Sequence, residues 1–372
     1  MIKEGLNLKK IHGDYPLLIA VFLLSVIGTI FIYSASNYSA LATYGDALYF
    51  VKKQIIGIVL GVVAMILTGI FDFNRLKKFT PYVCALAIIL LALVFVPGIG
   101  VENYGAKRWL GLGSFTIQPS EISKFALILF SATYVSKNPD KIKTFRGVLP
   151  ILLYGGLTCV LIILEPNMSI TVCVAVLMMT LLLAGGMKIK HLLFIVIPAL
   201  IGGVVLIIIE PYRLDRLMAF INPWSNPKGE GYQLLQSLYA LGSGGWFGVG
   251  LFNSRQKYAF LPFAESDFIL SVIGEEIGFV GMIAFFLLLA FIVFRGLKIA
   301  SKAPNVFGFM LAVGITMIFG IQVTVNALVV TGSIPPTGLP LPLVSSGNTS
   351  IIIFMAEMGV LFNISKCEKR RS

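Results

Sequence analysis

The segment Leu17-Leu-Ile-Ala-Val-Phe-Leu-Leu-Ser-Val-Ile-Gly-Thr-Ile-Phe-Ile-Tyr33 contains no charged residue. A helix needs about 20 predominantly apolar residues to cross the hydrocarbon core of a bilayer, and lipid offers no partner to an unpaired backbone amide. Runs of the same kind recur along the rest of the chain. We therefore predict an all-α, polytopic membrane protein that forms one domain over residues 1–372, with about ten transmembrane helices near residues 17–33, 54–70, 82–96, 117–135, 147–164, 168–183, 192–209, 268–294, 307–330 and 343–364.

The overall composition also indicates lipid as the solvent. Hydrophobic residues make up 57% of the chain and charged residues 12%, which is about half the charged fraction of a typical soluble domain. The net charge of +12 at pH 7 does not predict nucleic-acid binding, because the basic residues gather in short segments between apolar runs. The four cysteines lack metal-binding spacing, so they predict neither a metal site nor a disulfide framework.

The positive charges predict an orientation. With the N-terminus inside, most of the 29 lysine and arginine residues fall on the inner side, as the positive-inside rule expects. Both termini are then cytoplasmic, and the long segment 210–266, between the seventh and eighth runs, is extracytoplasmic. This segment is longer than a connection needs to be. Its Trp224, Tyr232 and Trp246 are typical of an ordered chain at the membrane interface.

Two charged residues lie at the start of the fourth run. Glu121 and Lys124 are three positions apart, so they share one face of a helix. One interpretation is a mutually neutralised pair that fixes helix packing. The other adds Lys107 and Arg108, which would complete a basic pocket for an anionic headgroup such as a lipid diphosphate.

A carboxylate stands at the end of the long segment. Asp267 directly precedes the eighth run, where a helix N-terminus keeps an acid ionised. It could be an N-cap, which is a common use of aspartate. Alternatively, Ser266 is the cap and Asp267 faces a cavity with a catalytic role. The same segment carries a second basic set, Arg213, Arg216, Lys228, Arg255 and Lys257.

The connection between the ninth and tenth runs is rich in proline. Residues 331–342 hold several prolines and glycines, and Ser345-Ser-Gly-Asn-Thr-Ser350 follows. Proline and glycine at this density prevent a regular helix. Non-helical backbone at membrane depth is tolerated only where it is buried in protein or lines a watery cavity. We therefore predict a re-entrant segment that borders a binding site.

Several of these motifs resemble the signatures of the SEDS family (FtsW, RodA, SpoVE), and they follow in order across nearly the whole chain. They are Lys107-Arg-Trp109, Gln118-Pro-Ser-Glu121 with Lys124, Asn222-Pro-Trp224, Asp267-Phe268 and Gly274-Glu-Glu276. The last of these, together with Asn253-Ser-Arg-Gln-Lys-Tyr258, is more similar to the FtsW and SpoVE branch than to RodA.

The resemblance implies a peptidoglycan glycosyltransferase that polymerises lipid II on the outer face of the bacterial cytoplasmic membrane, in division or sporulation wall synthesis. It also implies a class B penicillin-binding protein as partner, within a division or elongation complex. Asp267 matches the family's catalytic aspartate, and we expect it to act as a general base. The residues expected to bind substrate are Lys107, Arg108, Glu121, Lys124, Arg213, Arg216, Lys257, Ser345 and Ser346. A divalent cation, Mg²⁺ or Mn²⁺, could assist, although no ligand set in the sequence indicates a metal site.

Three positions depart from the family pattern. The frequent PDxG motif is Pro166-Asn-Met-Ser169 here, a usual glutamate is Phe263, and the SYGGSS pattern is Ser345-Ser-Gly-Asn-Thr-Ser350. The alternative function is a lipid II flippase, or another transporter of polyprenyl-linked substrates, because intramembrane acids also suit a transport pathway. A scaffold for division proteins is compatible with either function. Against transport, no inverted repeat is evident, and the polar residues are concentrated on one face.

Overall fold

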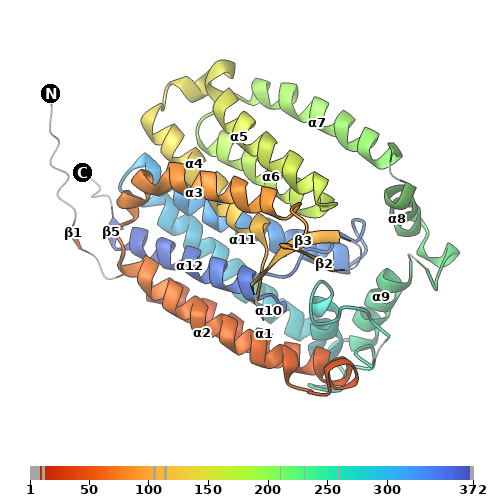
Figure 1. Cartoon of the computed structure of the whole chain (residues 1–372). Helices are drawn as coiled ribbons and strands as arrows, with labels where there is room; N and C mark the ends of the chain where they lie inside the picture. Colours follow the sequence, from red (N-terminus) through yellow and green to blue (C-terminus); the bar gives the residue numbers. More distant parts are fainter. Residues whose placement is uncertain are drawn as a thin grey trace, which may run out of the picture.

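A computed structural model describes residues 9–10, 13–103, 106–112, 115–209, 211–229, 231–258 and 260–368 (Figure 1). Each of the ten predicted runs falls on a helix in this part of the chain. These helices are α1 (Tyr15–Tyr44), α2 (Tyr49–Ile70), α3 (Leu76–Leu93), α4 (Pro119–Lys137), α5 (Phe145–Leu164), α6 (Met168–Ala184), α7 (Ile189–Ile209), α10 (Ile269–Ser301), α11 (Val306–Val330) and α12 (Asn348–Ser365).

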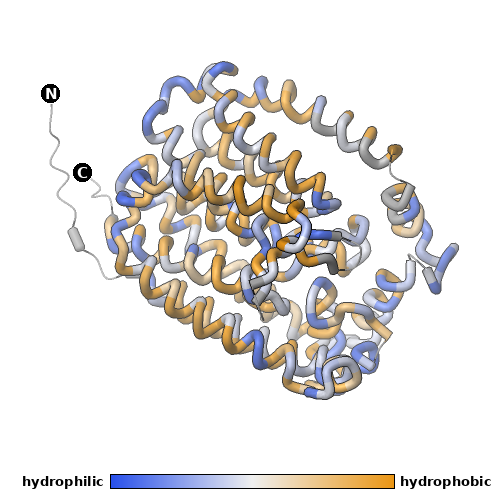
Figure 2. The backbone as a smooth tube through the Cα atoms, viewed as in Figure 1, coloured by the Kyte–Doolittle hydropathy of each residue, from blue (hydrophilic) through white to orange (hydrophobic). Residues whose placement is uncertain are grey.

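The chain is a multi-pass membrane protein. Within the described ranges, seven helical segments are long and apolar enough to cross a bilayer, namely α1, α2, α3 with the short turn before it, α5, α10, α11 and α12. Figure 2 shows hydrophobic residues along these helices and hydrophilic residues mainly at helix ends and connections. Large side chains such as Ile19, Ile66 and Leu287 are exposed, which is the normal state of a lipid-facing surface.

The prediction of an all-α chain is wrong for the connection between α3 and α4. This connection forms an antiparallel sheet of three strands, β2 (Gly100–Asn103), β3 (Ala106–Leu112) and β4 (Phe115–Ile117). The segment is too short and too rich in glycine for another helix. Its backbone groups instead pair between strands, with Val101 opposite Trp109 and Leu110 opposite Ile117, as buried or interfacial amides require.

The long segment between α7 and α10 is more structured than a loop. It contains α8 (Pro211–Ile221), the short turn Pro223–Ser225 and α9 (Tyr232–Gly244). At the two ends of the described chain, β1 (Lys9–Lys10) pairs with β5 (Cys367–Glu368). Both described ends therefore lie at the same end of the bundle (Figure 1). Near them Arg295 of α10 forms an ion pair of 2.6 Å with Asp14, and we call this the Asp14 end. The opposite end, where α4, α10 and α12 begin, is the Asp267 end.

Small residues bring α2 and α12 into close contact. Gly57 and Gly61 of α2 are buried and four positions apart. A Cβ atom at Gly61 would lie 2.5 Å from the sulfur of Met355 on α12. Glycines at this spacing let two membrane helices approach closely, which replaces the hydrophobic driving force that lipid does not supply.

A kink in α10 fixes the segment that follows α9. Gly278 has a φ of +66°, so the helical ladder is interrupted there. The freed carbonyl oxygens of Glu275 and Glu276 accept from the backbone N–H groups of Val249 and Gly250, at 3.0 and 3.1 Å. Beyond the kink, the N–H of Phe279 donates to Gly245 at 2.9 Å. These bonds attach residues 245–250 to the first turns of α10, directly after Asp267.

We expect Gly278→Ala to lower stability strongly. An alanine would have to adopt a left-handed backbone, and its Cβ would lie 2.1 Å from the backbone nitrogen of Gly248. The strain and the displaced backbone together should cost about 3 kcal/mol or more, visible as a lower midpoint of thermal unfolding in detergent. Gly202→Ala in α7 is the matched control, because a Cβ there meets nothing within 4 Å. Equal midpoints for the two variants would contradict this account of the kink.

Candidate active site

A cavity of about 1610 Å³ opens at the Asp267 end. Its polar lining includes Arg108, Gln118, Asn167, Gln233 and Asp267, and its apolar lining continues along α10 and α11. The apolar part on α10 reaches from Phe286 to Leu297, about 16 Å along a helix with a rise of 1.5 Å per residue. The cavity is therefore amphiphilic, with charged groups at one end and a long apolar groove leading away from them.

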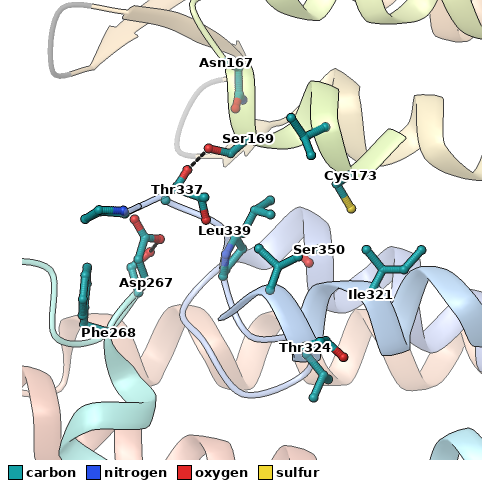
Figure 3. Close-up of a pocket in the computed structure, with 18 of the residues that line it drawn as sticks. Asn167, Ser169, Cys173, Asp267, Phe268, Ile321, Thr324, Thr337, Leu339 and Ser350 are labelled. Carbon is teal, nitrogen blue, oxygen red and sulfur yellow. Dashed lines mark hydrogen bonds between the residues drawn. The ribbon is translucent and has the colours of Figure 1, made fainter. Parts of the chain in front are cut away.

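Asp267 lies on the cavity wall (Figure 3). The interpretation of Asp267 or Ser266 as the helix cap is wrong, because the N-cap of α10 is Phe268 and that cap has no side-chain bond. The hydroxyl of Ser266 instead donates to Oδ1 of Asp267 at 2.9 Å. The backbone carbonyl of Asp267 accepts from Nδ2 of Asn326 on α11 at 2.8 Å. Both its backbone and its side chain are thus held by neighbours.

The proline-rich connection forms the wall beside Asp267. Residues 334–340 are not helical and line the cavity, which confirms the prediction of a non-helical segment at a cavity. Asn326 donates to the carbonyl of Leu339 as well, at 2.8 Å. Gly338 has a φ of +70°, and a Cβ there would lie 3.2 Å from Oδ2 of Asp267. A glycine at this position therefore permits both the turn and the close approach to the carboxylate.

The two predicted serines have different places. Ser346 lines the cavity, and its N–H donates to the carbonyl of Glu265 at 2.9 Å. Ser345 does not line it. Its hydroxyl accepts from the N–H of Leu341 at 2.8 Å and donates to the carbonyl of Ser266 at 2.6 Å. Ser345 therefore joins the proline-rich connection to the chain just before Asp267.

The small sheet contributes the cationic part of the cavity. Arg108 on β3 lines the cavity, and its guanidinium donates to the carbonyls of Glu165 and Pro166, at 3.4 and 2.5 Å. Lys107 beside it is exposed and does not belong to the described lining. Asn167 lines the cavity and caps α6, since its side chain accepts from the N–H of Ile170 at 3.4 Å. Two residues on, the hydroxyl of Ser169 donates to the carbonyl of Thr337 (Figure 3).

Glu121 and Lys124 form a buried ion pair rather than part of the cavity wall. Nζ of Lys124 lies 2.6 Å from Oε1 of Glu121, and their side chains are 3% and 1% exposed. Lys124 also stands 5.7 Å from the ring centroid of Phe354 on α12. Neither residue lines the cavity, so the geometry matches the interpretation as a packing pair.

Lys257, expected to bind substrate, is instead buried away from the cavity. Its ammonium group lies 3.5 Å from Oε1 of Glu276 on α10 and donates to Ser34 of α1 at 3.2 Å. The adjacent Ser254 donates to Glu275 at 2.5 Å. The cause is the pair of buried glutamates on α10, which need hydrogen-bond donors and draw residues 254–257 inward. The backbone of Arg213 and Arg216 lies in α8, and their side chains lie outside the described residues.

Sequence reasoning missed several polar groups at or near the cavity, including Gln118, Gln233, Asn326, Glu165 and Glu265. Asn326 had one signal, since it is one of two amides, with Gln322, within an apolar run. Burial raises the pKa of Glu165 to about 8, while the charge of Arg108 opposes that shift. Burial also raises the pKa of Glu265, and the charge of Asp267 adds to this effect.

The described residues bring no group of three or more His, Cys, Asp or Glu side chains together as a metal site. Among the residues of the described lining, Asp267 supplies the one carboxylate. Mg²⁺ is often held by one or two carboxylates together with substrate phosphates and water, so Asp267 suits a cation that arrives with a phosphorylated substrate but offers no complete cage.

The fold and the cavity define a class: a helical membrane protein with an amphiphilic site that joins a carboxylate, a guanidinium and an apolar groove. Comparison with known proteins gives the family. Residues 15–370 match the FtsW/RodA/SpoVE family, described as cell cycle protein. The chain belongs to this family.

Named relatives cover almost all of the chain. It is 38% identical to the stage V sporulation protein E of Bacillus subtilis, over 96% of this chain and 98% of that protein. It is 39% identical to a probable peptidoglycan glycosyltransferase FtsW of Trichlorobacter lovleyi, over 95% and 93% of the two chains.

Solved structures share the fold. A chain from a peptidoglycan synthase complex, studied for how polymerisation and crosslinking are coordinated, superposes with a TM-score of 0.78 at 26% identity, covering 95% of this chain and 97% of that one. The rod shape determining protein RodA of Thermus thermophilus superposes with a TM-score of 0.70 at 25% identity, covering 95% and 96%.

Proposed function

We propose that this chain is a peptidoglycan glycosyltransferase that polymerises lipid II, in division or sporulation wall synthesis. The observation that carries the proposal is that Asp267, Arg108 and a long apolar groove line one and the same cavity. Lipid II is an amphiphile of matching design, with sugars, a diphosphate and a polyprenyl chain. The relatives named as peptidoglycan glycosyltransferases support the same activity.

In the proposed reaction Asp267 is the general base. Its carboxylate takes the proton of the acceptor sugar hydroxyl as that oxygen attacks the anomeric carbon of the lipid-linked donor. The bond between that carbon and the diphosphate oxygen breaks, and undecaprenyl diphosphate leaves with the bonding electrons. A diphosphate is a good leaving group, so the main need is to stabilise its growing negative charge. The guanidinium of Arg108, on the same cavity wall, is suited to that task.

The apolar groove is the proposed path of a polyprenyl chain. Phe286, Leu289 and Val293 of α10 line it together with Met317 and Ile321 of α11. A polyprenyl chain already lies in an apolar solvent in the bilayer, so the groove would hold it through van der Waals contacts rather than through a hydrophobic gain. The groove thus favours a lipid-linked sugar over a soluble sugar nucleotide.

We propose that the Asp267 end faces outward across the bacterial cytoplasmic membrane. Ten spans, formed by the seven long apolar segments and by α4, α6 and α7, would place both termini in the cytoplasm and the segment 210–266 outside. The excess of lysine and arginine on the connections at the Asp14 end supports this orientation. It brings Asp267 to the face where lipid II is used.

We also propose a penicillin-binding protein of class B as the crosslinking partner, within a division or elongation complex. The support is the similarity to a chain of a peptidoglycan synthase complex.

The test of the function is a polymerisation assay with the purified full-length protein in detergent and lipid II as substrate. We expect glycan strands on a gel and release of undecaprenyl diphosphate, without added nucleotide. The flippase function would be favoured instead if the protein moved lipid II across a vesicle membrane but formed no polymer, either in vesicles or in detergent.

A further inference from the structure

Glu165 is a buried acid without a hydrogen-bond partner for its side chain. It is the C-cap residue of α5 and 1% exposed. Among the described residues, neither Oε1 nor Oε2 of Glu165 meets a donor. A buried carboxyl in this state is costly.

The charged group beside Glu165 is Arg108. The guanidinium donates to the backbone carbonyl of Glu165 and to that of Pro166, so cation and carboxyl share one turn of chain. Burial raises the pKa of this carboxyl, and the charge of Arg108 opposes that shift. The rest of this turn, Pro166-Asn-Met-Ser169, is uncharged, and the amide of Asn167 is engaged as the cap of α6. Within this turn Glu165 is therefore the acid that can balance Arg108.

We propose that Glu165 is a positioning residue that competes with an anionic ligand for the guanidinium of Arg108. This inference rests on the proposed function, since it takes the ligand to be the diphosphate of a lipid-linked substrate. When Glu165 is ionised, its carboxylate holds Arg108 against the turn at residues 165–166. When Glu165 is protonated, that attraction is lost, and the guanidinium interacts with the diphosphate without competition from a carboxylate.

The direction of the pH effect follows. The pKa of Glu165 is about 8, so the carboxyl is neutral at pH 6.5 and ionised at pH 9. Diphosphate affinity should fall as the pH rises through 8, because the ligand must then displace a carboxylate. A ligand that draws Arg108 away from Glu165 also favours protonation of Glu165. Binding near pH 8 should therefore be accompanied by proton uptake.

The experiment is a calorimetric titration of the full-length protein with farnesyl diphosphate, a water-soluble prenyl diphosphate, at pH 6.5 and pH 9. Wild type is compared with Glu165→Gln, an isosteric amide that cannot ionise. We expect equal dissociation constants at pH 6.5, and binding by the variant that is about three- to tenfold tighter than wild type at pH 9. The phosphates of farnesyl diphosphate also ionise with pH, but this affects wild type and variant equally, so it cancels when the two are compared at the same pH. Asp46→Asn, which removes a carboxyl that pairs with Lys52 and does not belong to the described cavity lining, should follow wild type.

Proton uptake gives a second measurement that needs no variant. Titrations of wild type near pH 8, in buffers with different ionisation enthalpies, should show an uptake that Glu165→Gln removes. The inference would be overturned if the ratio of the wild-type and Glu165→Gln dissociation constants did not change with pH. It would also be overturned if the variant bound farnesyl diphosphate more weakly than wild type at both pH values. If Arg108→Gln weakens binding while Glu165→Gln parallels wild type, only the role of Glu165 fails. If wild type binds no farnesyl diphosphate at either pH, the diphosphate site fails with it.

Discussion

Asp267→Asn should abolish polymerisation of lipid II, with a rate at least about 10³-fold below wild type. The amide has the size of the carboxylate and can still accept from the hydroxyl of Ser266, which lies 2.9 Å away in the wild-type protein. It cannot take a proton from the acceptor hydroxyl at neutral pH. Because Arg108 and the apolar groove are untouched, substrate binding should persist while turnover is lost. The measurement is glycan strand formation from purified lipid II, with the thermal unfolding midpoint as a check on folding.

Glu265→Gln is the matched control for that variant. Glu265 is an acid two residues before Asp267, and it does not belong to the described cavity lining. Its backbone carbonyl, which accepts from Ser346, is unchanged by the substitution. We expect activity within about threefold of wild type, the range of a small electrostatic change. Near-normal polymerisation by Asp267→Asn, or an equal loss in both variants, would exclude Asp267 as the base.

The helices were predictable because lipid imposes a simple rule. An apolar run that must satisfy its own backbone becomes a helix, and all ten runs do so. The boundaries moved where local chemistry intervened, as in α12, which begins at Asn348 rather than 343. The strands at 100–117 and the kink at Gly278 were not predictable, since both depend on backbone partners that are distant or lie in short, glycine-rich segments. The segment 245–250 can be matched to α10 only in three dimensions.

The site was predictable where a charged residue stands in an unusual place. Asp267, Arg108 and Ser346 were selected from the sequence, and all three line the cavity. The assignment of Lys257 failed because the sequence does not show that Glu275 and Glu276 are buried and need donors. Glu165 was overlooked because its importance comes from two features invisible in a sequence, namely its burial and the nearby guanidinium of Arg108.

The buried charges on α4 lead to the second large effect. Lys124→Met should destabilise the protein by about 3–5 kcal/mol, the cost of leaving a buried charge without its partner. The ammonium group lies 2.6 Å from Oε1 of Glu121, and both side chains are buried. Its removal leaves the carboxylate of Glu121 buried without that cation. Glu121→Gln should also lower the stability, because Lys124 then loses this carboxylate.

The double variant Glu121→Gln/Lys124→Met separates the two interpretations of this pair. Removing both charges should recover most of the stability lost in Lys124→Met, measured as the thermal unfolding midpoint and as the yield of monodisperse protein in detergent. If the pair serves packing alone, as its absence from the described cavity lining indicates, the folded double variant should also polymerise lipid II. A stable double variant that binds farnesyl diphosphate tenfold more weakly than wild type would instead assign Lys124 to the substrate. If the double variant recovered no stability, the ion-pair account would be contradicted. The destabilisation by Lys124→Met would then come from lost packing of the Lys124 side chain rather than from an unbalanced charge.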